Sequence, residues 1–254
     1  MKVGIIGDVH GNSAWLVHCI RQLAPHCDAF AQVGDFGWWP KFDHGVVFLD
    51  AIQQELEDWD KVLYWIDGNH EDHDSIAADL VETDDQGFEF AARWSRLRHI
   101  PRGHVWNWGG QTFVGVGGAV SVDHAYRQMG YNLFEAETIY PHQVRHLMSN
   151  VKADVLLSHD APIEVYLQSG MRVDWFTSHR AGQCREIVQK VVEATRPNLV
   201  VHGHWHQSRR CYLLGGGTLV RSLACDGTDF VKERSWAVYD TETRSLLSYT
   251  TLFA

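Results

Sequence analysis

The sequence predicts an α/β fold in which two sheets pack against each other and helices lie outside them. Short apolar runs that stop at a polar, glycine-containing turn recur along the chain, and segments with the three-to-four-residue apolar spacing of helices lie between them. Alternating strands and helices are typical of the α/β plan, in which chemistry collects at the carboxyl ends of the strands. The segments 104–118 and 211–250 show little helical spacing and are predicted to be strands joined by Gly or Asp/Thr turns, which adds a second sheet.

Five apolar runs are predicted to be buried strands, because their hydrophobic character is continuous rather than alternating. Each run is followed directly by polar residues. Five unrelated polar clusters would not all fall at the ends of apolar runs by chance. We therefore expect the five polar clusters to meet at one edge of a sheet. In chain order the runs are Lys2–Ile6 before Gly7 and Asp8, Ala29–Val33 before Gly34 and Asp35, Val62–Ile66 before Asp67 to His70, Val155–Leu157 before Ser158 to Asp160, and Leu199–Val201 before His202 to His204.

Two helices are predicted from the spacing of apolar side chains. One carries Ala14, Val17, Ile20 and Leu23, and the other carries the apolar residues between 187 and 192. No internal repeat or low-complexity linker divides the chain, and a chain of 254 residues is within the reach of one core. We therefore expect a single domain over residues 1–254.

The charge balance argues against polyanionic partners. With 22 Lys and Arg against 32 Asp and Glu, the net charge is −10, which disfavours bulk binding to nucleic acid and adhesion to anionic membranes. The five cysteines show no CxxC spacing, which indicates reduced thiols, and the N-terminal apolar stretch stops at Asp8, far short of a signal peptide or a membrane span. We therefore expect a cytoplasmic protein whose partner is a small molecule, and the sequence leaves its oligomeric state open.

The polar clusters contain the donors that a pair of divalent cations requires. Two ions about 3.5 to 4 Å apart share a bridging carboxylate and take further oxygen and nitrogen ligands. Because no cysteine belongs to the set, the site is suited to Mn²⁺, with Fe, Zn, Ni or Co as alternatives, rather than to a structural thiolate zinc site. Asp35 can bridge the ions, Asp8, His10 and His206 can complete one of them, and Asn69, His159 and His204 can complete the other.

In this order the motifs resemble the signature of the calcineurin-like metallophosphoesterases. They read Asp8-Val9-His10, Gly34-Asp35, Gly68-Asn69-His70-Glu71, His159 and Gly203-His204-Trp205-His206. The resemblance implies a four-layer αββα sandwich of two mixed sheets flanked by helices, a dinuclear metal centre, and hydrolysis of phosphate esters by a hydroxide that bridges the metals. It also implies that His70 protonates the leaving oxygen, and the competing interpretation is that His70 orients a metal ligand.

One departure from the family concerns the substrate. Its protein Ser/Thr phosphatases follow Gly-Asp with an Asp-Arg pair whose arginine clamps the phosphoryl group, whereas here Asp35 precedes Phe36-Gly37-Trp38-Trp39-Pro40. We therefore predict a phosphodiesterase for small or nucleotide-type substrates, with 2′,3′-cyclic nucleotides among the candidates. The alternatives are a phosphomonoesterase, acting on a protein or a small molecule with Arg127, Arg172 or Arg180 as its clamp, and a catalytically silent metal-binding module.

Five further residues are candidate substrate contacts. Trp38 and Trp39 follow the bridging Asp35, where their rings can stack on a nucleobase or simply close the core. Asp123, His124 and Arg127 follow a Gly-Gly strand end, and the guanidinium of Arg127 matches phosphate oxygens best.

The segment 161–182 can form a partial lid. Among the other histidines, His73 is expected to begin a helix and His202 to face away from the site. Ordinary roles are expected for six more, namely His18, His26, His44, His99, His104 and His142.

Overall fold

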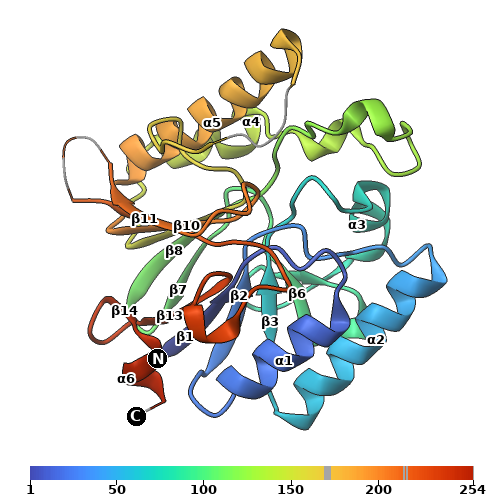
Figure 1. Ribbon diagram of the computed structural model, residues 1–254, viewed down its shortest axis with the longest axis vertical. Coiled ribbons are helices and arrows are strands. Elements are labelled where there is room, and N and C mark those ends of the chain that lie inside the picture. The colour runs from blue at the N-terminus through green and yellow to red at the C-terminus, as the bar shows by residue number, and fades with distance from the viewer. Residues whose placement is uncertain (169–172, 214, 216, 254) are drawn as a thin grey trace.

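The structure is a computed structural model that describes residues 1–168, 173–213, 215 and 217–253. Within this part of the chain two β-sheets face each other (Figure 1). Helices α1 (Ser13–Leu23) and α2 (Asp43–Asp58) pack on the outer face of one sheet, and helices α4 (Pro141–Val144) and α5 (Trp175–Thr195) pack on the outer face of the other. This arrangement is the four-layer αββα sandwich that the motifs imply, so the prediction of the fold is confirmed.

The first sheet has the spatial order β14-β13-β1-β2-β3-β6-β5-β4. Its centre is parallel, and antiparallel pairs flank the centre on both sides, so the sheet is mixed. Its strands are β1 (Lys2–Ile6), β2 (Ala29–Gln32), β3 (Leu63–Trp65), β4 (Glu82–Thr83), β5 (Glu89–Phe90), β6 (Leu97–His99), β13 (Trp236–Asp240) and β14 (Ser245–Leu247).

The second sheet has the spatial order β11-β12-β10-β9-β8-β7. Its four central strands are parallel and its two edge strands are antiparallel to their neighbours. Both stretches that the sequence predicts as strands joined by turns, 104–118 and 211–250, contribute strands to the two sheets. The strands here are β7 (Val105–Trp108), β8 (Gln111–Val116), β9 (Val155–Ser158), β10 (Leu199–His202), β11 (Arg209–Tyr212) and β12 (Leu219–Ser222).

The apolar runs are continuous because the central strands are buried on both faces. Ile5 of β1 packs in the core between the two sheets, whereas the next residue, Ile6, packs in the core under α1 and α2. In β9, Leu157 likewise joins the core between the sheets and Leu156 joins the core under α5. Since successive side chains of a strand point to opposite faces, a strand between two cores needs apolar residues at every position.

Both predicted helices are present, as α1 and α5. Helix α1 begins after Asn12, whose side chain accepts a hydrogen bond from the Trp15 N–H, and it buries a stripe of apolar side chains. Helix α2 is less evident from the sequence because its buried face includes Gln53 and Glu55. Two short helices, α3 (His73–Asp79) and α6 (Tyr249–Leu252), complete the described set, and none of the described helices is long and apolar enough to cross a bilayer.

The segment 161–182, predicted as a partial lid, is divided in the structure. Its later part, from Trp175, forms the first turns of α5. Arg172, one of the predicted phosphate clamps, lies outside the described residues.

Candidate metal centre

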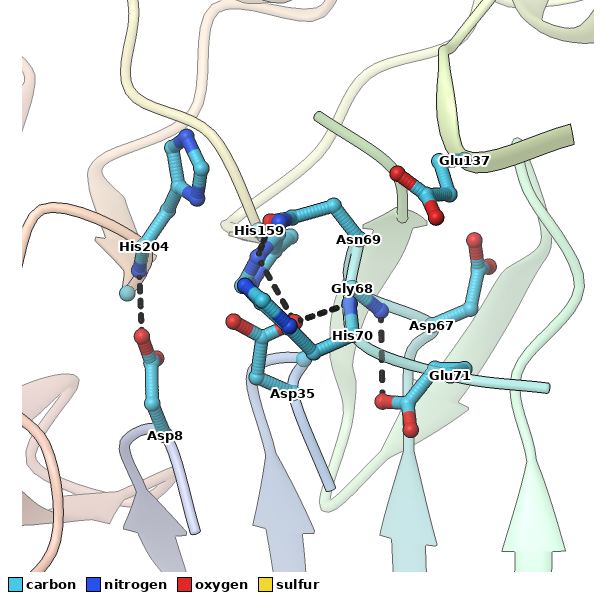
Figure 2. Close-up of polar contacts among 12 residues, drawn as sticks. Asp8, Asp35, Asp67, Gly68, Asn69, His70, Glu71, Glu137, His159 and His204 are labelled. Atoms are coloured by element: carbon cyan, nitrogen blue, oxygen red, sulfur yellow. Dashed lines mark hydrogen bonds and ion pairs between the residues drawn. The ribbon is translucent and has the colours of Figure 1, made fainter. Parts of the chain in front are cut away.

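The predicted ligands gather at the carboxyl ends of five strands, where the two sheets meet (Figure 2). Asp8, Asp35 and Asn69 follow β1, β2 and β3 of the first sheet, whereas His159 and His204 follow β9 and β10 of the second. The sequence predicted that the five polar clusters meet at one edge of a single sheet. This prediction is wrong, because the clusters come from two sheets. The reason is that the parallel strands of both sheets end on the same side of the sandwich, so their loops face one another.

Sharp turns present these side chains. His10, Asp35, His204 and His206 all have φ between 50° and 64°, a left-handed backbone that costs free energy in residues with a Cβ and that clusters at functional sites. His204 and His206 lie beyond β10, which ends at His202. The turn, rather than strand geometry, therefore brings both imidazoles to the centre.

Two glycines of the motifs make room for the carboxylates. A Cβ atom on Gly68 would collide with the Asp35 carboxylate, and one on Gly203 would collide with the Asp8 carboxylate. Only glycine allows the backbone to approach these oxygens so closely.

One group of potential ligand atoms comprises Asp8, His10, Asp35 and His206, all within 4.8 Å of one another. His10 Nε2 lies 3.4 Å from Asp35 Oδ2, and His206 Nε2 lies 3.2 Å from Asp8 Oδ2. The second carboxylate oxygen of Asp8, Oδ1, is buried and has no hydrogen-bond partner in the described residues. A buried oxygen without a partner is costly unless a cation binds it, so this group fits a divalent ion.

The second group comprises Asp35, His159 and His204, again within 4.8 Å of one another. His159 Nδ1 donates to the Val33 carbonyl at 2.8 Å, which leaves Nε2 to face the centre. Nε2 lies 3.3 Å from Asp35 Oδ1 and 3.0 Å from Asn69 Oδ1. Asp35 therefore belongs to both groups, with Oδ2 toward His10 and Oδ1 toward His159, as a bridging carboxylate requires.

The charges of the centre favour cations. Burial lowers the pKa of His159, but the Asp35 carboxylate outweighs burial and raises the pKa to about 10. The hydrogen bond to Asp8 raises the pKa of His206 to about 10. Burial and the neighbouring His159 lower the pKa of His204 to about 3, so its imidazole is neutral and free to act as a ligand. The negative charge that raises the pKa values of His159 and His206 also attracts divalent ions, which displace the protons from the imidazoles when they bind.

His70 lies beside both groups without belonging to either of them among the described residues. Its main-chain N–H donates to Asp35 Oδ1 at 2.8 Å, and its ring centroid lies 5.9 Å from that of His10. Its Nε2 lies 3.8 Å from Asp123 Oδ2, and burial lowers the pKa of His70. Asp123, predicted as a substrate contact, is thus placed where it can orient the imidazole of His70.

Arg127 holds Asn69 rather than offering itself to a phosphate. Its guanidinium contacts the Asn69 carbonyl at 3.1 Å, Ser121 Oγ at 2.5 Å and Glu137 Oε1 at 2.7 Å, and its Nε donates to the Asn132 carbonyl. Its side chain is 6% exposed. The prediction of Arg127 as a phosphate clamp is wrong in this structure, because its donors already have partners inside the protein.

The two tryptophans after Asp35 differ in position. Trp38 is fully buried, with its ring stacked on Trp65 at 5.4 Å and edge-on to Trp94. Of its two predicted roles, closing the core is therefore confirmed and stacking on a substrate is wrong. Trp39 is half-buried, donates from Nε1 to the His70 carbonyl at 2.9 Å, and lines a cavity together with His10. Only Trp39 of this pair remains available to a substrate.

His124 and Arg180, two further predicted contacts, line another cavity. This cavity of about 360 Å³ lies between the 120–140 segment and the start of α5, and Arg180 donates to Thr138 Oγ1 there at 3.2 Å. Neither residue is among the grouped potential ligands.

Two carboxylates that support the centre carried no predicted role. Glu71 is buried and accepts hydrogen bonds from the main-chain N–H groups of Phe36, Gly37 and Trp38 at 2.7 to 3.0 Å, which holds the loop after Asp35. Its place in the Gly-Asn-His-Glu motif was a usable signal. Asp226 lies 3.4 Å from His10 Nδ1 and accepts from Asn12 at 2.7 Å. No local motif marks Asp226, because it meets His10 only through the fold.

Two buried histidines outside the ligand groups, His73 and His202, have hydrogen-bond partners within the protein. His73 begins α3, as predicted, and its Nε2 lies 3.1 Å from the Gly68 carbonyl. His202 is buried and pairs with Ser222 Oγ at 2.7 Å. Neither belongs to the grouped ligand atoms, and the same holds for the six histidines to which the sequence assigns ordinary roles.

The model of the calcineurin-like phosphoesterase family matches residues 1–208, a segment that contains every predicted ligand. No curated protein matches the chain in sequence. Among solved structures, the chain is similar to a hypothetical protein from Thermus thermophilus, with 14% identity and a TM-score of 0.46 over 98% of this chain and 96% of that one. An archaeal phosphodiesterase has 10% identity and a TM-score of 0.46 over 97% of this chain and 98% of its own. The phosphopantetheinyl hydrolase of Mycobacterium tuberculosis has 14% identity and a TM-score of 0.40 over 88% of this chain and 90% of its own.

Proposed function

The chain belongs to the calcineurin-like phosphoesterase family, and from this membership we propose that it hydrolyses phosphodiester bonds of small or nucleotide-type substrates with two divalent metal ions. The observation that carries the proposal is the position of Asp35. Its two carboxylate oxygens face two separate groups of imidazoles and carboxylates, with His10 on one side and His159 on the other. An arrangement of this kind serves two ions that share one bridging ligand.

Each ion has its own set of donors. Asp8, His10 and His206 would hold one ion, and Asn69, His159 and His204 would hold the other, with Asp35 between them. When bound, such ions lower the pKa of water and neutralise charge that builds on the phosphoryl oxygens. Carboxylate, amide and imidazole donors suit Mn²⁺, which we propose as the metal, and they also accept Fe, Zn, Ni or Co.

His70 is the proposed proton donor to the leaving oxygen. It lies next to the ligand Asn69, and its ring stands 5.9 Å from that of His10, at the rim of the centre. The carboxylate of Asp123, 3.8 Å from Nε2, favours the imidazolium form that a proton donor requires and opposes the burial that lowers the pKa of His70. A positioned imidazole contributes roughly 10²–10⁴-fold to the rate when the leaving group is poor.

The preference for diesters is supported by the state of Arg127 and Arg180, the two candidate clamps among the described residues. A monoester dianion gains most from an extra cation that grips its oxygens, and Arg127 was the strongest candidate. Its guanidinium is engaged with Asn69, Ser121 and Glu137, and Arg180 is bonded to Thr138. A diester carries one negative charge less and depends less on such a clamp.

We further propose a small-molecule partner and a cytoplasmic location. All five cysteines are free thiols, as suits a reducing compartment, and the net charge of −10 opposes bulk binding to nucleic acid.

The test uses one purified sample. Its metal content is measured first, and its rates of hydrolysis are then compared across a panel of phosphate esters. The panel compares bis(p-nitrophenyl) phosphate, p-nitrophenyl phosphate and 2′,3′-cyclic nucleotides, with Asp35→Asn as the inactive control. Diesters are expected to be the faster substrates. A monoester hydrolysed faster than every diester would identify a phosphomonoesterase, and a folded, metal-loaded protein without activity would identify a silent metal-binding module.

A further inference from the structure

A cavity of about 380 Å³ opens directly beside His10. Four aromatic side chains line it, those of Trp39, Phe42, Tyr131 and the more deeply buried Phe48, together with Gly11 and His44. The volume is within the range of about 300–1,000 Å³ that is typical of small-molecule sites. The cavity therefore joins a predicted metal ligand to an aromatic wall.

The aromatic wall is held in place by contacts within the protein. The Trp39 and Phe42 rings stack with centroids 6.0 Å apart, and Phe42 meets Tyr131 edge-on at 5.3 Å. The Lys41 ammonium lies 5.4 Å from the Trp39 and Phe42 centroids and 5.8 Å from that of Tyr131. It also lies 4.8 Å from the Phe134 centroid, and it pairs with the fully buried Asp72 at 3.1 Å. An anchored cation among these four rings keeps them in a fixed relation before any ligand arrives.

The cavity lies on the side of the centre where His70 stands. Trp39 donates to the His70 carbonyl, so the wall and the main chain of the proposed acid are directly bonded. His10 lines the cavity and its ring is 5.9 Å from that of His70. An acid that protonates the leaving oxygen must lie within hydrogen-bond reach of it, so the leaving group must begin next to His70 and extend from there.

We propose that this cavity is the leaving-group subsite and that it takes a planar aromatic group, which a nucleoside supplies as its base and an aryl alcohol supplies as its ring. The inference rests on the proposed phosphodiesterase function. Aromatic side chains stack on bases of any sequence, which makes the subsite selective for a flat ring without making it selective for one base. The reaction releases the ring-bearing alcohol with its oxygen protonated, and water supplies the new phosphoryl oxygen.

The test uses pairs of substrates whose leaving oxygens are alike. The first pair is the methyl phosphodiester of thymidine 5′-phosphate and the same compound without its base, in which a hydrogen replaces thymine on the sugar. The second pair is the 2-phenylethyl and 2-cyclohexylethyl methyl phosphates. The expected kcat/KM is roughly tenfold to a hundredfold higher for the ring-bearing member, the range that stacking of one base supports. A preference in the first pair alone identifies the nucleoside, and one of equal size in both pairs identifies any flat ring.

Tyr131 provides the variant that separates this subsite from the metal centre. Its side chain is 51% exposed, so replacement does not open a core cavity. Tyr131→Ala is expected to remove most of the preference by raising KM for the ring-bearing esters more than for the base-free ester. Tyr131→Phe keeps the ring and is expected to keep the preference.

Failure of this inference is distinguishable from failure of the proposed function. If none of the diesters is hydrolysed by metal-loaded protein, the phosphodiesterase proposal fails. If bis(p-nitrophenyl) phosphate is hydrolysed but both members of each pair react equally, the subsite does not exist as described. If the ring-bearing esters are preferred but methanol and thymidine 5′-phosphate are the products, the cavity holds the group that stays on phosphorus, which overturns the leaving-group assignment.

Discussion

Ser121 Oγ accepts a hydrogen bond from Asn69 Nδ2 at 3.0 Å, and this contact decides which end of the Asn69 amide faces the metal centre. The Ser121 hydroxyl donates its own proton to the Glu137 carboxylate, so it can only accept from Asn69. Asn69 Oδ1 is thereby turned toward His159. The orientation of a ligand thus depends on residues from the segment 121–137, which carries no predicted ligand.

Ser121→Ala is expected to lower the affinity for the ion near Asn69 and to leave the affinity for the other ion unchanged. Loss of the hydroxyl frees the Asn69 amide to rotate, and loss of such an orienting partner typically lowers metal affinity about 10–100-fold. The ion of the Asp8, His10 and His206 group should keep its affinity. Titration calorimetry with Mn²⁺ resolves the two sites. Thr195→Val, which removes a buried hydroxyl bonded only within α5, is the matched control, and equal affinities in both variants would contradict this role of Ser121.

Asp35→Asn is expected to abolish binding of both ions. Asparagine retains an oxygen that can accept the His70 N–H, so the loop keeps its hydrogen bond while the bridging charge is lost. Metal content after dialysis measures the result, and circular dichroism checks the fold. Retention of one ion at the affinity of the unmodified protein would mean that Asp35 serves a single site.

His70→Ala is expected to leave both ions bound and to lower turnover selectively. The loss should reach about 10²–10⁴-fold for diesters with poor leaving groups and be much smaller for p-nitrophenyl esters, whose oxygen leaves without a proton. The measurement is kcat across diesters of graded leaving-group pKa. Equal losses across the series would assign His70 to orientation of a ligand.

Arg127→Gln is expected to destabilise the fold by about 3–5 kcal/mol, because it leaves the buried Glu137 carboxylate without its cationic partner. The double variant Arg127→Gln with Glu137→Gln should be less destabilised than the two single effects added together. Urea unfolding measures both. The kcat/KM values of monoesters and diesters should fall alike, and a rise in KM confined to monoesters would restore Arg127 as a phosphate contact.

His73 is expected to make the metal-free protein less stable in acid. Burial lowers the pKa of His73 to about 4, whereas an unfolded histidine has a pKa near 6.5. As the pH falls from about 6.5 to 4, the unfolded chain binds this proton first, so the free energy of unfolding decreases by on the order of 3 kcal/mol.

The measurement for His73 is the difference between two proteins. Burial raises the pKa values of Glu71 and Glu137 to about 7, and these groups act in the opposite direction because the folded state binds their protons first. Their effect is common to the unmodified protein and to His73→Gln, which can still donate to the Gly68 carbonyl. His73→Gln should lose less stability between pH 6.5 and 4, and parallel profiles would exclude His73 as the cause.

The predictions from sequence were strongest where chemistry restricts the residue type. A pair of divalent ions requires carboxylates, amides and imidazoles, and a parallel sheet presents its loops at the ends of apolar strands, so both signals can be read locally. They were weakest where one residue type serves two purposes. Trp38 and Trp39 are adjacent and identical, yet Trp38 is stacked on Trp65 in the core and Trp39 lines a cavity. The residues adjacent to a tryptophan in the sequence do not determine where its ring lies relative to distant strands.

The sequence by itself determined the family, the αββα plan and the set of candidate ligands, because these depend on hydrophobic runs and on donor types at strand ends. Only the tertiary structure decided how that set is supported. It paired His10 with Asp226, 216 positions away in the chain, and it enclosed Arg127 beside Glu137 instead of leaving it for a phosphate. Contacts of this kind arise when two sheets pack together, and the packing of the whole chain, rather than any local pattern, selects which polar groups become partners.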